Sequence, residues 1–402
     1  MIKNILFISD SSLRNPILQS QGLPFVYNLN HTQFKPFVLS FEETNLGKEE
    51  SLEIQAIINK YNSKIDFFPV TIRKKGVLPS WLYFSWKRIK ILYKIISNHQ
   101  ITLLHARSFN PAFLAIVIKI FLKPSIKVIY DNRGLYIDEL IFRNALSKGS
   151  IKEKIFRTIE KVIMIKCDQM VVVSNAFKSY IVEQWGDRNK NISIKTKTIP
   201  NRTQLIFNDS DIVSRQTLME DRTTCVYTGS SASWQGADNF YKVFSIILDR
   251  IPTTYFKILT YEPEAFLNHP PENIKLAERL IVDKIKFSDV KTELINATFG
   301  ILLRKPDIVS RVSAPIKFAE YLAAGLPVIL REGIGDTEQI IKKYNVGVII
   351  KKNNYVTAVS ELKELLDDKD VFYRCLRVAD KEFNINISFK QYQEIYDRLY
   401  SI

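Results

Sequence analysis

The sequence predicts an α/β protein with two doubly wound parallel sheets. Short buried-type runs alternate with amphipathic helical patterns in both halves of the 402-residue chain, as parallel sheets covered by helices require. Between the halves, Asn208 to Asp221 is polar and lacks a strand pattern. We therefore expect one domain at residues 1–207, a linker at 208–221, a second domain at 222–375, and a separate C-terminal segment at 376–402.

Composition predicts a globular protein in a reducing compartment. Hydrophobic residues make up 46% of the chain, with 13 Gly and 15 Pro. Cys167, Cys225 and Cys375 lie far apart and none has metal-ligand spacing, which argues against a disulfide framework or a zinc site. The opening strand is too short for a signal peptide, and the longest apolar run, Ala112 to Leu122, is too short to span a bilayer. We expect a cytoplasmic protein that requires no metal and no cofactor.

The net charge of +15 indicates an acidic partner. Zinc spacing, an RNA-recognition signature and an evident recognition helix are all missing from the sequence, so we do not expect nucleic acid binding. Residues 72–94 mix aromatic residues, among them Trp81 and Trp86, with seven lysines and arginines. This segment could lie peripherally on an anionic membrane surface. It could equally be a surface helix whose aromatic residues face the core.

The first strand is expected at Lys3 to Ser9. A polar loop with Gly22 follows it, at the sheet edge where ligands bind in such folds. No Walker motif or G-x-G-x-x-G follows this strand, which argues against a P-loop NTPase and a dinucleotide dehydrogenase. Phe37 to Ser40 and Lys64 to Val70 are the next expected strands.

Two further strands end in polar residues at the same edge of the first sheet. Ile101 to Ala106 runs into H-A-R-S, which contains His105, and Lys127 to Tyr130 runs into D-N-R-G, which contains Arg133. The carboxyl ends of parallel strands line the ligand crevice. A single histidine is more often a structural residue than a functional one, and D-N-R-G alone is an ordinary turn signal.

The second half contains the most informative stretch, S-A-P-I-K-F-A-E-Y-L-A-A-G-L-P-V-I-L from Ser313 to Leu330. Ser313 is the expected cap of a helix that ends at Gly325, and a buried strand follows. Lys317 and Glu320 are three residues apart, so they share a face near the N-terminal end of the helix, which favours an anion. This arrangement suits a sugar nucleotide, with the phosphate at the helix end and the ribose on the carboxylate. An exposed Lys–Glu pair is the alternative.

This stretch resembles the donor-binding core of the retaining family-4 glycosyltransferases of GT-B fold, in the variant S-x-P-x-K-F-x-E-Y-L-A-x-G-L-P-V-I. The match has no gap from Ser313 to Ile329, and G-I-G-D-T-E from Gly333 resembles the glycine turn of the family. The resemblance implies two Rossmann-like domains that face a central cleft. It also implies that the helix within residues 376–402 crosses back onto the N-terminal domain.

The resemblance also implies roles for individual residues. Glu320 would hold the nucleotide ribose and Lys317 would face the pyrophosphate, while His105 would contact the transferred sugar. The remaining expected site residues are Arg133, Arg304, Gly22, Gly229, Ser230 and Ser313. Three family residues are replaced here. Val312 occupies the position of a second glutamate, and the turn after Thr228 contains W-Q-G instead of the usual Arg and Lys, so Arg304 is the candidate for neutralising the diphosphate.

These features predict a retaining glycosyltransferase that moves a sugar from a nucleotide-diphosphate sugar to an acceptor hydroxyl. The basic charge favours a glycan or lipid-linked acceptor in bacterial surface polysaccharide assembly. Two alternatives remain open at this point. One is a sugar-nucleotide epimerase on the same fold, and the other is a non-catalytic basic protein that binds a membrane or nucleic acid.

Overall fold

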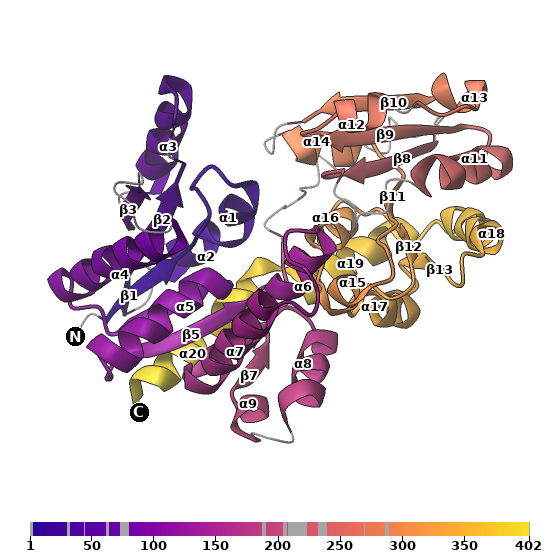
Figure 1. The fold of residues 1–402 in the computed structure, drawn as a ribbon. Coiled ribbons are helices and arrows are strands. Elements are labelled where there is room, and N and C mark those ends of the chain that lie inside the picture. The colour runs from indigo at the N-terminus through magenta and orange to yellow at the C-terminus, as the bar shows by residue number, and fades with distance from the viewer. Residues whose placement is uncertain are drawn as a thin grey trace. The chain divides into compact units, whose positions relative to one another are not determined.

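The computed structural model describes residues 3–29, 33–43, 45–61, 64–72, 80–186, 190–203, 207, 223–231, 239–268, 270–285 and 289–401, with the backbone alone at 80–84 and 190. The expected linker at 208–221, the W-Q-G turn and residues 73–79 of the basic aromatic segment lie outside these residues. The chain divides into two compact units (Figure 1). The first contains Met1–Pro200 and Ile385–Ile402, and the second contains Asn201–Asn384.

The described residues of the first unit form a seven-stranded parallel sheet in the order β3-β2-β1-β4-β5-β6-β7. Its strands are β1 (Lys3–Ile8), β2 (Phe34–Glu42), β3 (Asp66–Thr71), β4 (Leu103–Arg107), β5 (Lys127–Asn132), β6 (Gln169–Val172) and β7 (Thr196–Thr198). The chain first builds outward from β1 to β3 and then returns to build from β4 to β7. The strand order therefore reverses between β1 and β4, where ligands bind in doubly wound sheets.

Helices cover this sheet on both faces, and the last one comes from the far end of the chain. They are α1 (Pro16–Gln21), α2 (Leu23–Asn28), α3 (Lys48–Tyr61), α4 (Ser80–Asn98), α5 (Phe109–Val117), the π-helical turn η2 (Ile118–Leu122), α6 (Tyr136–Phe142), α7 (Ile151–Lys166), α8 (Asn175–Ile181), η3 (Val182–Gly186), α9 (Lys190–Ile194) and α20 (Ile385–Ser401). In Figure 1, α20 is the yellow helix that lies among the magenta elements of this unit. Its Tyr392 and Tyr396 join one core with Phe25 of α2.

The described residues of the second unit form a six-stranded parallel sheet in the order β10-β9-β8-β11-β12-β13. Its strands are β8 (Thr223–Thr228), β9 (Thr254–Thr260), β10 (Leu280–Lys284), β11 (Phe299–Leu302), β12 (Val328–Arg331) and β13 (Gly347–Ile350). The order reverses between β8 and β11, so the loops after these two strands meet at the switch point. The two sheets confirm the predicted α/β class with two doubly wound domains.

The helices of the second unit are α11 (Phe240–Arg250), α12 (Glu264–Leu267), α13 (Ile274–Ala277), α14 (Val290–Ile295), α15 (Ile308–Val312), α16 (Ile316–Ala323), α17 (Thr337–Tyr344), α18 (Tyr355–Leu366) and α19 (Val371–Phe383). This unit begins and ends elsewhere than the sequence indicated. Asn201 joins it because its side-chain amide donates to the Ala314 carbonyl at 2.7 Å. Residues 376–384 stay in it because Phe383 packs on Phe318 of α16, with ring centroids 5.7 Å apart.

The local signals around α16 behave largely as expected. Gly325 adopts φ +72°, and its N–H donates to Leu322 while the Leu326 N–H donates to Tyr321, a Schellman end to the helix. The predicted cap is wrong, because the Ser313 hydroxyl turns back and donates to the Ser310 carbonyl at 2.8 Å, at the end of α15. In the described part of the chain, no helix is both long enough and apolar enough to cross a bilayer.

Candidate functional site

The side chain of Lys317 lies at the switch point of the second sheet. Its ammonium donates to the Tyr227 hydroxyl at 3.1 Å and lies 4.3 Å from the centre of the Tyr227 ring. Burial lowers the pKa of Lys317 well below its usual range, and the nearby positive charge of Arg304 lowers it further. No carboxylate in the described residues lies within ion-pair distance of this ammonium. An incoming anion would therefore be favourable here.

Glu320 lies one turn further along α16 and is 7% exposed. Burial raises the pKa of its carboxyl group to about 7, against the opposing effect of Lys317. None of the described residues donates a hydrogen bond to its side chain. The Glu320 oxygens are not among the fully enclosed unbonded side-chain atoms of the described residues, so they remain open to solvent and to a ligand. Hydroxyl groups of a ligand would supply the missing hydrogen bonds.

The loop after β8 brings Gly229 and Ser230 to the same place. Gly229 adopts φ +139°, and a Cβ atom built on it would lie 2.0 Å from Lys317 Nζ, so any side chain would collide with the lysine. The Ser230 carbonyl accepts a hydrogen bond from the Tyr227 hydroxyl at 2.7 Å. Arg304 follows β11, on the other side of the switch point, and its charge acts on Lys317.

Ser313 is in contact with the predicted glycine turn. Gly335 has φ +47°, and a Cβ atom there would lie 1.9 Å from the Ser313 carbonyl oxygen. At the start of the turn, the Gly333 N–H donates to the Glu338 carboxylate at 2.6 Å. The glycine turn is thus held by the Glu338 side chain and by its contact with Ser313 in the loop before α16. The second unit brings five predicted residues around one point, which we call the donor site: Gly229, Ser230, Arg304, Lys317 and Glu320.

The remaining predicted residues lie in the first unit, and their surroundings differ from the expectation. His105 is 1% exposed. Its Nδ1 lies 2.6 Å from the Tyr396 hydroxyl and its Nε2 lies 3.3 Å from Asp131. Burial lowers the pKa of His105, so the imidazole is neutral at neutral pH. These contacts enclose His105 within the first unit, and its contact with a transferred sugar stays a prediction.

Arg133 belongs to the same buried cluster. Its guanidinium lies 3.2 Å from the carboxylate of Asp131, which also accepts a hydrogen bond from Tyr392 of α20 at 3.1 Å. Burial opposes ionisation of Asp131, but Arg133, His105 and Arg107 outweigh it and hold its pKa well below its usual range. Arg133 thus neutralises a buried carboxylate, and α20 is fastened to the sheet through that carboxylate.

Gly22 joins two short helices that follow β1. It lies between α1 and α2 with φ −110°, and its N–H donates to the Leu18 carbonyl at 2.9 Å. A Cβ atom at this position would lie 2.5 Å from the Leu18 side chain. The backbone N–H of Gly22 thus already has a partner, and the expected role of this residue in donor or acceptor binding stays a prediction.

Sequence reasoning missed the two tyrosines that build the donor site. Tyr227 holds Lys317, and Tyr321 accepts a hydrogen bond from the Thr228 N–H at 2.9 Å, which ties α16 to the end of β8. Gly300 leaves room for the Tyr321 ring, because a Cβ atom there would lie 2.2 Å from it. The sequence does contain one signal for the role of Tyr227. It lies two residues before Gly229, and residues two apart along a strand point to the same face of the sheet.

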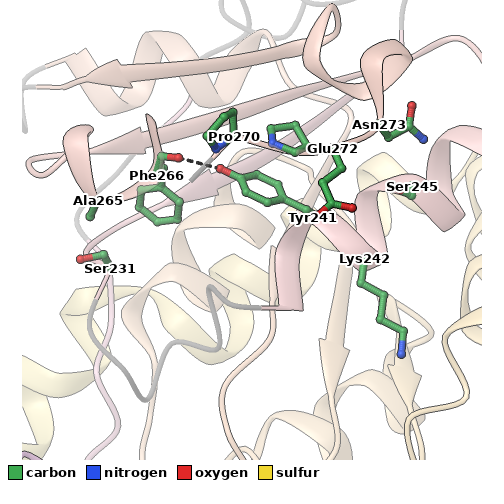
Figure 2. A pocket seen from close by; sticks show the side chains of 10 residues that line it. Ser231, Tyr241, Lys242, Ser245, Ala265, Phe266, Pro270, Glu272 and Asn273 are labelled. Carbon is green, nitrogen blue, oxygen red and sulfur yellow. Dashed lines mark hydrogen bonds between the residues drawn. The ribbon is translucent and has the colours of Figure 1, made fainter. Parts of the chain in front are cut away.

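A cavity of about 750 Å³ lies elsewhere in the second unit. Figure 2 shows its wall, in which the Tyr241 ring faces Phe266 and Pro270 while Lys242 points away. The Tyr241 hydroxyl donates to the Phe266 carbonyl at 3.0 Å, which fixes the ring. Lys317 and Glu320 do not line this cavity.

Two family models match separate parts of the chain. Glycosyltransferase Family 4 matches residues 48–201, and the C-terminal domain of glucosyltransferase 3-like proteins matches residues 288–368. No curated protein matches the chain.

Solved structures share the fold along almost the whole length. A glycosyltransferase from Rickettsia africae has a TM-score of 0.68 at 14% identity, covering 99% of this chain and 98% of its own. HepE from Anabaena, in complex with UDP and glucose, has a TM-score of 0.69 at 14% identity, and the match covers all of both chains. WaaG, a glycosyltransferase involved in lipopolysaccharide biosynthesis, has a TM-score of 0.62 at 12% identity, and the match covers 94% of this chain and 96% of WaaG. The protein is therefore an enzyme of the glycosyltransferase class with the GT-B fold, and its N-terminal half contains a family 4 region.

Proposed function

We propose that this glycosyltransferase takes its sugar from a nucleotide-diphosphate donor bound at the donor site. The observation that carries the proposal is Glu320, a buried carboxylate that no described residue bonds, one turn beyond the half-buried ammonium of Lys317. The spacing fits a nucleotide ribose on the carboxylate with its diphosphate on the ammonium. Arg304 adds a second positive charge on the other side of the switch point.

The chemistry follows from these charges. As the glycosidic bond breaks, negative charge grows on the leaving diphosphate, and fixed positive groups stabilise it. Lys317 and Arg304 supply that charge, so the proposed reaction needs no metal. The resemblance of Ser313 to Ile329 to retaining enzymes supports transfer with retention of the anomeric configuration. Asp131 is not a candidate base, because its carboxylate lies buried among Arg133, His105 and Tyr392.

UDP-sugars are the first donors to test, because HepE was solved with UDP and glucose. For the acceptor we propose a glycan or lipid-linked intermediate of a bacterial surface polysaccharide. The likeness to WaaG, a glycosyltransferase involved in lipopolysaccharide biosynthesis, and the net charge of +15 support this class of acceptor.

A peripheral contact with an anionic membrane is part of the proposal. Trp86 on α4 is 48% exposed, with the ammonium groups of Lys90 and Lys87 at 4.5 Å and 5.3 Å from its ring centre. An exposed indole flanked by lysines suits a headgroup region, where the ring is partly buried and the charges meet anionic lipids.

The experiment that tests the proposed function has two parts. The wild-type protein is first screened with UDP-, GDP- and ADP-sugars for thermal stabilisation, since a ligand at about 100 times its Kd stabilises by about 2.7 kcal/mol. Release of the nucleoside diphosphate is then measured with the best donor. We expect Lys317→Ala to unfold at an unchanged temperature and to lose activity about 100-fold or more.

Other outcomes would contradict the proposal. Wild-type turnover in a folded Lys317→Ala protein would remove the phosphate role. Conversion of the sugar nucleotide to an epimer, without release of diphosphate, would indicate the epimerase reaction instead. A protein that no nucleotide sugar stabilises, and that Glu320→Ala leaves unchanged, would indicate a non-catalytic binding protein.

A further inference from the structure

Tyr227 is the last large side chain before the loop that carries Gly229. It is 0% exposed, and its ring packs edge-on against Phe240 with centroids 4.6 Å apart. Its hydroxyl makes two hydrogen bonds at once, because it donates to the Ser230 carbonyl and accepts from Lys317. The ring and the hydroxyl are both held in place, so Tyr227 offers a rigid support to a lysine whose own stem is flexible.

We propose that Tyr227 is a positioning residue, which holds the Lys317 amine at the place where the donor diphosphate is neutralised. Gly229 completes the arrangement, because any side chain at this position would push the amine aside. This inference rests on the proposed function of the donor site and extends it to a residue whose hydroxyl is already bonded to Ser230 and Lys317. A lysine side chain loses conformational entropy when it is fixed, so fixing it before the donor binds favours the complex.

The electrostatics of the site agree with this geometry. The charged or titratable groups that act on Lys317 are Arg304 from the loop after β11 and Glu320 from α16, while Glu262 after β9 acts on Tyr227. Burial and Arg304 disfavour the ammonium, whereas a hydrogen bond to the Tyr227 hydroxyl favours it. Removing that hydroxyl should lower the pKa of Lys317 further. As the pH rises, the lysine of this variant would lose its proton, and diphosphate binding would weaken, at a lower pH than in the wild type.

A double-mutant cycle separates this role from a merely structural one. The four proteins are the wild type, Tyr227→Phe, Lys317→Met and the double variant. Each is titrated with UDP, GDP and ADP and with the matching nucleosides, which lack phosphate. For the diphosphate that the wild type binds best, we expect Tyr227→Phe to weaken affinity about tenfold, or about 1.4 kcal/mol. Affinity for the nucleoside should not change. In the Lys317→Met background, Tyr227→Phe should cause no further loss.

The matched control is Tyr241→Phe, which likewise removes a partly buried hydrogen bond from a tyrosine hydroxyl to a backbone carbonyl, that of Phe266 in the wall of the cavity in Figure 2. It should leave the affinity for diphosphates unchanged. Thermal unfolding of each variant verifies folding. As a second readout, the pH at which diphosphate affinity falls by half should be lower in Tyr227→Phe than in the wild type.

Three results would overturn the inference. Unchanged diphosphate affinity in Tyr227→Phe would do so, and so would an equal loss in the wild-type and Lys317→Met backgrounds, because the effect would then not pass through the lysine. An equal loss for diphosphate and nucleoside would indicate a general disturbance of the loop. A wild-type protein that binds none of the three diphosphates would overturn the proposed function itself, and this result is distinct from the other three.

Discussion

At the residue scale, the donor site depends on the half-buried amine of Lys317 and on the carboxylate of Glu320, a residue that is 7% exposed. Lys317 bonds to Tyr227, and no described residue bonds the carboxylate of Glu320. The sequence predicted both residues from a spacing of three along a helix, but an exposed ion pair has the same spacing. The difference lies in burial by β8 and β11, which are distant in sequence. For the same reason, the role of Tyr227 could not be predicted.

The effect of burial on the pKa of a carboxyl group can also be tested at Glu160 on α7. Glu160 is 2% exposed, and burial raises its pKa from 4.5 to about 7, with Arg157 opposing. Since the folded state binds the proton more tightly than the unfolded state, the carboxyl group costs stability as the pH rises from about 4.5 to 7, and the full cost remains above this range. We expect Glu160→Gln to raise the free energy of unfolding by about 3 kcal/mol at pH 8.

The pH dependence is the decisive feature of this prediction. The stabilisation by Glu160→Gln should shrink toward zero near pH 4, where the carboxyl group is protonated in both states. Urea unfolding at the two pH values measures it. Glu361→Gln, at an exposed position on α18, is the control and should have no effect at either pH. A stabilisation of equal size at both pH values would mean that packing, not ionisation, is responsible.

At the element scale, helix α20 is fastened to the first sheet by buried polar contacts. Its Tyr392 donates to Asp131 and its Tyr396 bonds His105. The sequence correctly indicated that His105 and Asp131 lie near the ends of neighbouring strands, although β4 and β5 extend past them to Arg107 and Asn132. It could not indicate that two tyrosines from the end of the chain would cover them, because that requires the path of α20. The edge strand β10 was also missed, since Asp283 and Lys284 interrupt its apolar pattern.

Asp131→Asn tests the attachment of α20. The change keeps the shape but leaves Arg133 and Arg107 without their buried counter-charge, so we expect a loss of about 3–5 kcal/mol in the free energy of unfolding. Trypsin should also cleave faster after Lys390, within α20. Urea unfolding and timed proteolysis at pH 7 measure the two effects.

The same substitution at an exposed ion pair is the control. Asp66 lies 2.8 Å from Lys35 in this unit, and both side chains are about half exposed. Asp66→Asn should cost about 0–1 kcal/mol. Because the pKa of Asp131 is lowered in the folded state, its stabilisation is present above about pH 4 and is lost as the pH falls further. Equal losses in the two variants would contradict the proposed anchoring.

At the scale of the whole molecule, the net charge of +15 gives a testable surface property. We expect the protein to bind vesicles that contain anionic lipid, to bind neutral phosphatidylcholine vesicles weakly, and to dissociate as the salt concentration rises. The double variant Trp86→Ala, Lys90→Glu should bind anionic vesicles about tenfold more weakly, because each basic residue at the surface contributes about 1 kcal/mol. Co-sedimentation measures the bound fraction.

The control makes the same change of charge and removes an exposed apolar side chain in the second unit. Ile274 and Lys275 are both exposed on α13, so Ile274→Ala, Lys275→Glu should leave vesicle binding nearly unchanged. An equal loss in both double variants would mean that net charge alone drives binding. In that case α4 would have no special part in it.

The fold of the whole molecule was the most predictable level, because buried strands alternate with helices in both halves and the pattern needs no knowledge of distant contacts. The donor site was predictable in part. Residues on a strand end or a helix start could be placed from their own segment, as Gly229 and Lys317 were. The environment of His105 is made by another segment, α20, so its burial could not be predicted from its own strand.

The most direct test of the central claim is a crystal structure of the protein with the nucleoside diphosphate that stabilises it most. We predict a phosphate oxygen within hydrogen-bond distance of Lys317 Nζ and a ribose hydroxyl on the carboxylate of Glu320. A nucleotide bound away from both side chains, for example against Tyr241 in the cavity of Figure 2, would contradict the account.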